Sequence, residues 1–293
     1  MCTKTTEFLG NAFSDSKTKT SIILSGGADL AVFFELGAMS VLEERLGMKV
    51  ENLHVMAGGS GGAISGFLKA AGIDCDQPGV VPQIKDVLRT DKSNKTGLEK
   101  LGKYSQDGVI EHISSLVNNE YQHWKDLPVD LRIASTMFYP KIKKVIFSKH
   151  NKSIDGQYIS TYDAVKCSIT VPALYTPVKL ANTYHLDGEI IGPIPLEEGR
   201  DSDVMVIISV YGPYNGFLLN PKHSIPNKFQ KLNQLWMKYR INKMKKDNPK
   251  LKAILIQNQY DDHDIATYNK FSLKNDEALK TEGRRAVWKA KFI

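Results

Sequence analysis

The sequence predicts an α/β protein whose central sheet is mostly parallel. Short apolar segments rich in β-branched residues alternate along the chain with segments whose apolar residues have helical spacing. Two of the apolar segments lead into glycine-rich turns that precede a helical pattern. The 293 residues, 42% hydrophobic and 24% charged, are typical of a globular chain that buries a large core without a metal or disulfide.

The first predicted unit consists of a strand at residues 21–25, the turn Gly26-Gly27 and a helix at residues 34–46. The strand is indicated by a run of apolar, β-branched residues. The helix is indicated by apolar residues at helical spacing, namely Leu36, Met39, Leu42 and Leu46. Gly47 follows directly and can cap the C-terminus of this helix.

The second predicted unit begins with a short apolar strand at residues 53–57. This strand leads into the glycine-rich segment 58–62, and a helix follows through about Ala71. A polar segment at residues 76–108 is interpreted as a surface insertion that contains a helix. Further strands are predicted at residues 131–136, 144–147, 204–210 and 253–256.

The segment 58–62 fits the pattern G-x-S-x-G, with Ser60 at its centre. A serine exposed where a strand turns sharply into a helix has no room for side chains two residues away, so Gly58 and Gly62 suit this geometry. The free N–H groups at the start of the following helix would favour a developing negative charge. A flexible linker has a similar composition, but a linker would have polar flanks, whereas both flanks here are apolar.

Gly26 and Gly27 can supply backbone N–H donors for an oxyanion, because they lie between a strand and a helix. A phosphate-binding turn or a plain tight turn would look similar. The third glycine of G-x-G-x-x-G and the Gly-Lys-Ser/Thr of a P-loop are both absent, which argues against nucleotide binding.

A serine nucleophile needs a general base, and none of the seven histidines lies in a recognisable motif. His223 and His263 come after Asp187, as a Ser–Asp–His order would require. His185 is interpreted as a surface residue at the end of a strand. Asp187, which precedes Gly188, is the better candidate, although an acidic residue before glycine is more often a simple turn.

Taken together, these motifs resemble those of the patatin-like phospholipase family. The resemblance covers roughly residues 22–210. It is carried by LSGG at 24–27, GGSGG at 58–62, the strand 131–135 with the stretch 144–147, SITVPALYTPV at 168–178, DG at 187–188, and Pro195.

The resemblance implies a three-layer α/β/α fold and a serine lipid acyl hydrolase that acts on phospholipids or related lipids. It assigns Ser60 as the nucleophile and Asp187 as the base, with no cofactor and no metal. The implied oxyanion donors are the amides near Gly26, Gly27, Ala28 and Gly61. Residues 1–20 are then a polar N-terminal leader, residues 21–212 the catalytic core, and residues 213–293 a basic helical region that packs on or extends the same domain.

The sequence also departs from the family pattern. Family members usually read G-G-G-x-R/K-G after the first strand, but here Ala28 replaces the third glycine, and the basic residue is absent. The segment up to Gly37 is also about one residue longer. Glu189 replaces the small residue that usually follows Asp-Gly, and it either points away or raises the pKa of Asp187 by repulsion. The alternative reading is a catalytically impaired protein of this fold that binds a membrane or a partner.

The basic residues gather in the C-terminal quarter of a chain whose net charge is +7. From Pro221 to the end there are 17 Lys and Arg against 7 Asp and Glu. A helix predicted at residues 226–247 carries an apolar stripe flanked by charge: Phe229, Leu232, Trp236 and Tyr239, with Lys243, Lys245 and Lys246 among its basic residues. The stripe either packs on the core or, with Trp236 and these lysines, contacts an anionic membrane.

The sequence leads to further expectations about location and partners. Three cysteines without metal-ligand spacing suit a reducing compartment. Neither a signal peptide nor a membrane-spanning segment is evident, so a cytoplasmic or peripheral membrane location is expected. The expected partner is a lipid surface, and nucleic acid is not expected because no known motif for it is present. Whether a protein activator takes part is left open.

Overall fold

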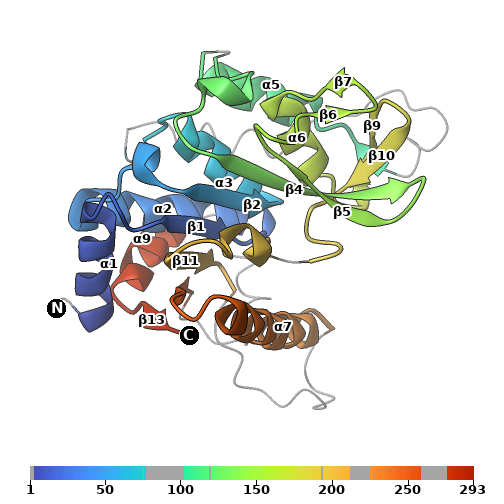
Figure 1. Ribbon diagram of the computed structural model, residues 1–293. Coiled ribbons are helices and arrows are strands. Elements are labelled where there is room, and N and C mark those ends of the chain that lie inside the picture. The colour runs from blue at the N-terminus through green and yellow to red at the C-terminus, as the bar shows by residue number, and fades with distance from the viewer. Residues whose placement is uncertain are drawn as a thin grey trace.

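The chain folds as a central sheet with helices on both faces in the computed structural model (Figure 1). This arrangement confirms the predicted α/β fold with a three-layer order. The structure describes residues 3–74, 76, 102–118, 120–192, 194–211, 225–258 and 276–293. Most of the predicted insertion at residues 76–108 lies outside these residues.

The strands of the central sheet follow a mostly parallel order. They are β1 (Thr20–Leu24), β2 (Val55–Gly59), β4 (Leu131–Tyr139), β5 (Lys143–Phe147), β9 (Val178–Leu180), β10 (Thr183–Leu186), β11 (Val204–Ser209), β12 (Lys252–Gln257) and β13 (Lys291–Phe292). Their order is β13-β12-β11-β1-β2-β4-β10-β9, with β5 paired to β4. The neighbours from β12 to β4 run parallel, and β13, β10, β9 and β5 pair antiparallel at the edges.

The helices and the short elements complete the described fold. The α-helices are α1 (Lys4–Ser14), α2 (Ala28–Leu46), α3 (Gly61–Ala70), α5 (Asp107–Leu116), α6 (Thr161–Ser168), α7 (Ile225–Asp247) and α9 (Asp276–Val287). The 3-10 helices are η1 (Val50–Asn52), η3 (Trp124–Asp126) and η4 (Leu196–Gly199). Two small sheets pair β3 (Gly102–Tyr104) with β8 (Ala173–Tyr175) and β6 (Ser153–Ile154) with β7 (Gln157–Tyr158).

Alternate side chains of the central strands enter two separate hydrophobic clusters, as the period of two in a strand requires. On β1, Ile22 and Leu24 belong to the larger cluster, which includes residues of α2, α3 and α9. Ile23 belongs to the smaller cluster, which includes residues of η4 and α7. The inner strands are therefore buried on both faces, which explains why they read as continuous apolar runs rather than as alternating ones.

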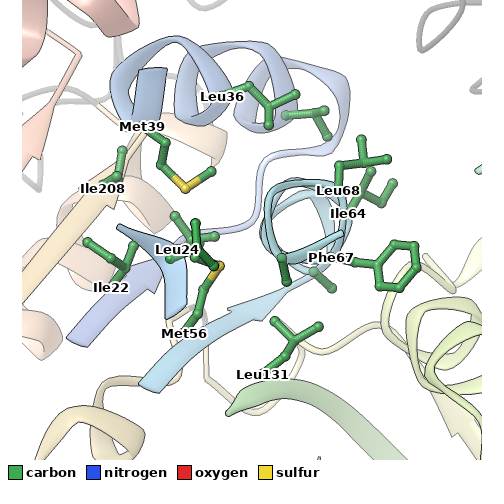
Figure 2. Close-up of a cluster of buried hydrophobic side chains, with 14 of the residues drawn as sticks. Ile22, Leu24, Leu36, Met39, Met56, Ile64, Phe67, Leu68, Leu131 and Ile208 are labelled. Atoms are coloured by element: carbon green, nitrogen blue, oxygen red, sulfur yellow. The ribbon is translucent and has the colours of Figure 1, made fainter. Parts of the chain in front are cut away.

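The larger cluster holds β1, β2, α2 and α3 in fixed relative positions. Figure 2 shows the side chains of Leu24, Met39 and Met56 gathered between these strands and helices, and all three are fully buried. Full burial of such side chains contributes roughly 1.5–3 kcal/mol each. The two strand-to-helix turns, β1 to α2 and β2 to α3, are thus anchored by the same packing.

Helix α2 begins at Ala28, earlier than the predicted start at residue 34. Nearly all of its residues between Ala31 and Leu42 are buried, so its first turns lack the one-sided apolar pattern that reveals a surface helix. Its predicted end is confirmed, because Gly47 has a left-handed φ of 72° and its N–H donates to the carbonyl of Glu43.

The N-terminal residues form α1 within the segment that the sequence analysis set apart as a leader. A capping box between Thr3 and Thr6 starts this helix. Leu9 is fully buried and Phe13 is nearly so, and both belong to the larger cluster. Phe8 contacts Phe292 of β13, with ring centroids 5.2 Å apart, so both ends of the described chain lie on the same side of the molecule (Figure 1).

The described helices offer no transmembrane segment, since none is both long enough and apolar enough to cross a bilayer.

Candidate active site

Ser60 lies at the turn where β2 ends and α3 begins. Its backbone has a φ of 53° and a ψ of −126°, a combination that residues other than glycine rarely adopt. The chain thereby changes from strand to helix within one residue, which is the geometry of a nucleophile elbow. The serine is 5% exposed, so it lies in a site that is largely closed to solvent.

The glycines around Ser60 are required by close backbone contacts. A Cβ on Gly58 would lie 2.1 Å from the carbonyl oxygen of Gly62. A Cβ on Gly62 would lie 2.4 Å from the carbonyl oxygen of Ser25, in the loop that follows β1. A Cβ on Gly61 would lie 2.3 Å from the carbonyl oxygen of Ala28. The elbow is therefore pressed against the start of α2, and this contact brings the two glycine-rich turns together.

Asp187 follows directly after β10 and is buried, with 5% of its surface exposed. Its Oδ1 accepts a hydrogen bond of 2.9 Å from the backbone N–H of Glu189. The Ser60 hydroxyl interacts with the carboxylate and lowers its pKa, but burial is the larger effect and raises the pKa of Asp187 to about 6. Oδ2 is buried and has no hydrogen-bond partner of good geometry among the described residues. The carboxylate thus keeps capacity to accept a proton.

Ser168, at the end of α6, connects Ser60 to the turn that carries Asp187. Its hydroxyl accepts a 2.9 Å hydrogen bond from the backbone N–H of Ser60 and donates a 2.6 Å bond to the carbonyl of Ala134 on β4. Its carbonyl accepts a 3.0 Å bond from the N–H of Gly188. Sequence reasoning assigned no role to this serine. The sequence signal that could have found it is its position at the start of the run 168–178, one of the segments that carry the family resemblance.

The turn between β1 and α2 contains the predicted oxyanion donors. Gly27 has a φ of +136°, and a Cβ there would lie 2.6 Å from Cγ1 of Val210, so only glycine fits without strain. Ala28 also has a positive φ, of 53°, and is the first residue of α2. The N–H of Gly26, by contrast, donates a 3.0 Å hydrogen bond to Oε1 of Glu189.

The Glu189 side chain points toward the turn between β1 and α2, where it contacts Gly26. Its carboxyl group lies directly over Gly26, where an added Cβ would be 2.0 Å from Cδ of Glu189. The Tyr211 hydroxyl also interacts with this carboxyl group and lowers its pKa. Burial and the charge of Asp187 raise the pKa of Glu189. The backbone N–H of Glu189, in turn, donates to the Asp187 carboxylate and lowers the pKa of Asp187.

Another buried carboxyl group, that of Glu35, lies next to the turn between β1 and α2. Glu35 of α2 is fully buried and accepts hydrogen bonds from the hydroxyls of Ser65 and Ser25, at 2.5 and 3.3 Å. Burial raises its pKa well above the ordinary value for a glutamate. Among the described residues, no group of His, Cys, Asp and Glu is arranged to hold a metal ion.

The structure corrects the interpretation of His185 as a surface residue. This histidine is fully buried on β10, where its ring contacts the hydroxyls of Ser135 and Thr183 at 3.2 and 3.0 Å. Burial lowers its pKa to about 4, so it is neutral at pH 7. The sequence around His185 does not reveal this burial, because the burial depends on β4 and β9, which pack beside β10. The candidates His223 and His263 lie outside the described residues.

Helix α7 covers the second face of the sheet with Met237, Ile241 and Met244, which are all buried. Tyr239 of the predicted stripe is 65% exposed and so does not pack on the core, while the side chains of Phe229 and Leu232 lie outside the described part. Trp236 is half-buried, and the Arg240 guanidinium lies 5.8 Å from its ring centroid. Lys243 and Lys246 are exposed, whereas Lys245 donates to the carbonyl of Ile293.

Fold and site together define a class: an α/β protein with a serine at a strand-to-helix elbow and a buried aspartate beside it. A model of one family of this class, the patatin-like phospholipases, matches residues 22–199, which is more than half of the chain. The chain belongs to the patatin-like phospholipase family.

Several solved structures resemble this chain at low sequence identity. VipD from Legionella pneumophila is 15% identical, with 94% of this chain and 68% of VipD covered at a TM-score of 0.41. Human GIVD cytosolic phospholipase A2 is 11% identical, with coverages of 81% and 48% and a TM-score of 0.44. ExoU from Pseudomonas aeruginosa, in complex with SpcU, is 13% identical, with coverages of 94% and 54% and a TM-score of 0.38. The chain thus spans about half the length of the last two. No curated protein matches it.

Proposed function

We propose that this protein is a serine lipid acyl hydrolase that cleaves fatty acyl esters through an acyl-Ser60 intermediate, with Asp187 as the base. Membership of the patatin-like phospholipase family supports lipid hydrolysis. The observation that carries the residue assignment is the Asp187 carboxyl group. It interacts with the hydroxyl of a serine in the elbow conformation, and its Oδ2 is buried without a partner among the described residues.

The first half of the reaction transfers the acyl group to the enzyme. The Ser60 hydroxyl oxygen attacks the ester carbonyl carbon while its proton passes to Asp187. Negative charge then develops on the carbonyl oxygen, and we assign its stabilisation to the backbone N–H groups of Gly27, Ala28 and Gly61, at the starts of α2 and α3. When the intermediate collapses, the alcohol leaves and takes the proton from Asp187.

The second half of the reaction releases the fatty acid. Asp187 removes a proton from a water molecule as its oxygen attacks the acyl carbon, and Ser60 regains a proton when the carboxylic acid departs. A normal aspartate is a weak base for this work because its pKa is near 3.9. The pKa of about 6 at Asp187 brings the base closer to neutral pH, so proton transfer during attack is less uphill.

Exposed apolar side chains beside the site favour a lipid surface as the place of action. Ile190 and Ile191 follow Glu189 directly and are 48% and 41% exposed. On α7, Leu235 and Tyr239 are exposed beside several lysines. Adjacent apolar and basic groups of this kind suit contact with the interface of an anionic membrane. We therefore propose a peripheral membrane location during catalysis.

A second candidate function is that of a binding protein with this fold but without the activity. It is favoured by the altered turn after β1, where the N–H of Gly26 already donates to Glu189. Labelling with a fluorophosphonate probe separates the two functions. A working hydrolase should form an adduct at Ser60, whereas a binding protein should not be labelled.

The proposed activity is tested by mass spectrometry of the lipids released from mixed phospholipid vesicles. Ser60→Ala and Asp187→Asn should each lower fatty acid release by about 10³-fold or more, because the two groups act in one proton transfer. Ser115→Ala, an exposed serine on α5, serves as the matched control and should keep full activity. Release that persists in Ser60→Ala would rule out the acyl-serine route.

A further inference from the structure

The Gly26 amide and the Tyr211 hydroxyl both direct a hydrogen-bond donor at the Glu189 carboxyl group. The amide donates to Oε1 at 3.0 Å, and the Tyr211 hydroxyl, in the loop that follows β11, interacts with the same carboxyl group. The Tyr211 oxygen also lies 3.6 Å from the position that a Cβ on Gly27 would occupy. Both donors therefore lie at the turn where an oxyanion was expected to bind.

This position is unfavourable for a carboxylate unless the donors hold it there. Asp187 and Glu35 both repel Glu189, and none of the described cations contributes to its electrostatic environment. Burial raises the pKa of Glu189 most, whereas the Gly26 amide and the Tyr211 hydroxyl act in the opposite direction and favour the charged form of its carboxyl group. Donors that stabilise a carboxylate oxygen can equally stabilise the oxygen of a tetrahedral intermediate, which carries the same charge.

We propose that the Gly26 amide and the Tyr211 hydroxyl are additional oxyanion donors, and that Glu189 fills this position in the resting enzyme until the substrate displaces it. The inference rests on the proposed acyl hydrolase function. In this arrangement Tyr211, a neutral donor, takes the place of the basic residue that is absent from the family pattern. It also gives a role to the glutamate that follows Asp187-Gly188, whose backbone N–H donates to the Asp187 carboxylate.

The displacement of Glu189 requires only a side-chain rotation. The N–H of Glu189 stays bonded to Oδ1 of Asp187, and Gly188 is held by Ser168 and by close contact with Ala134. Ile190 and Ile191, the next residues, are exposed. The backbone of the base turn is therefore fixed, while the carboxyl group of Glu189 adjoins a partly open surface.

The test measures the second-order rate at which a small, water-soluble fluorophosphonate labels Ser60, because the phosphoryl oxygen of the adduct occupies the oxyanion position. Glu189→Ala should label about 10-fold faster than wild type, since the two donors become free. Adding Tyr211→Phe to Glu189→Ala should then slow labelling by about 10²-fold, the order of effect expected for one lost donor. Glu51→Ala and Tyr158→Phe, exposed residues on η1 and β7, are the matched controls.

The outcomes separate this inference from the proposed function. Slower labelling of Glu189→Ala, with circular dichroism like that of wild type, would overturn the role of Glu189 as a removable occupant. Glu189→Gln keeps the shape of the side chain and should give an intermediate rate, so it replaces the alanine variant if that one misfolds. Equal rates with and without the Tyr211 hydroxyl would remove Tyr211 from the oxyanion site. Absence of Ser60 labelling in every variant would overturn the hydrolase proposal itself.

Discussion

Burial and catalysis make opposite demands on Asp187. An ionised carboxylate is stabilised by water, and the site removes that water, so the pKa of Asp187 rises from 3.8 to about 6. The native state therefore binds the proton of Asp187 more tightly than the unfolded chain does. The resulting stability is fully present below pH 3.8 and is lost as the pH rises through about 6.

Replacing Asp187 should consequently stabilise the fold at high pH while it abolishes activity. We expect Asp187→Asn to raise the free energy of unfolding at pH 8 by up to about 3 kcal/mol, the linkage value of a shift of roughly two pKa units. The gain should shrink toward pH 4, where wild type is protonated. Urea unfolding at both pH values measures it. A gain that grows toward acid pH would show that the sign of the pKa shift is wrong.

The same pKa predicts the acid limb of the activity profile. Since Asp187 acts as a base only when ionised, kcat/KM should fall about tenfold for each pH unit below about 6. Initial rates on a soluble ester between pH 4.5 and 8, spaced at about half-unit intervals, check this. A limb near pH 4 would indicate that Asp187 is solvated in the working enzyme.

Ser168 is expected to be a positioning residue, because its hydroxyl holds the amide of the strained Ser60. Ser168→Ala leaves that buried N–H unpaired, at a cost of about 1–3 kcal/mol. We expect kcat to fall by about 10-fold or more with KM little changed. Ser135→Ala is the matched control, as this buried serine on β4 also loses hydrogen bonds but does not touch Ser60. Equal kcat losses in both variants would make the role of Ser168 purely structural.

At the scale of elements, α7 has two different faces. Its buried residues Met237, Ile241 and Met244 pack on the sheet, whereas Tyr239 of the predicted stripe is exposed. Lys243 and Lys246 remain exposed, whereas Lys245 is engaged with the C-terminal residue. A reversal of charge at Lys245 would therefore disturb the fold as well as the surface.

A membrane role of α7 is tested with its two exposed lysines, Lys243 and Lys246. Lys243→Glu combined with Lys246→Glu should weaken binding to phosphatidylserine vesicles, because each basic group near an anionic surface contributes about 1 kcal/mol. Co-sedimentation measures the bound fraction, and added salt should weaken wild-type binding in the same way. The control is the same pair of changes at Lys4 and Lys17, which are exposed near α1. Equal binding to neutral and anionic vesicles would leave these lysines as solvated surface charge.

At the scale of the molecule, the candidate site is positioned by the packing of helices on one face of the central sheet. Helices α2 and α3 lie against each other and against β1 and β2, so the two glycine turns that precede them meet. Asp187 follows β10, which pairs antiparallel with β4, and Ser60 follows β2, which pairs parallel with β4. The shared neighbour β4 therefore places Ser60 and Asp187 close together. The site is thus assembled from segments more than a hundred residues apart.

The inner strands and the two turns could be predicted from the sequence because their causes are local. A strand buried on both faces is a continuous apolar run, and an elbow needs glycines at fixed positions whatever surrounds it. The early start of α2 escaped prediction because a helix buried on all sides leaves no periodic pattern. Helix α1 does have such a pattern, since its buried residues Leu9, Ala12 and Phe13 lie three and four positions apart, and the prediction overlooked it.

By itself the sequence determined the sheet, the elbow around Ser60, the Asp187-Gly188 turn and the family resemblance, since each of these depends on neighbouring residues in the chain. Only the tertiary structure decided that His185 is buried, that Ser168 holds the Ser60 amide, and that Glu189 reaches back to Gly26. The physical reason is that burial and side-chain direction are set by residues far away in sequence, and these contacts exist only once the layers have packed.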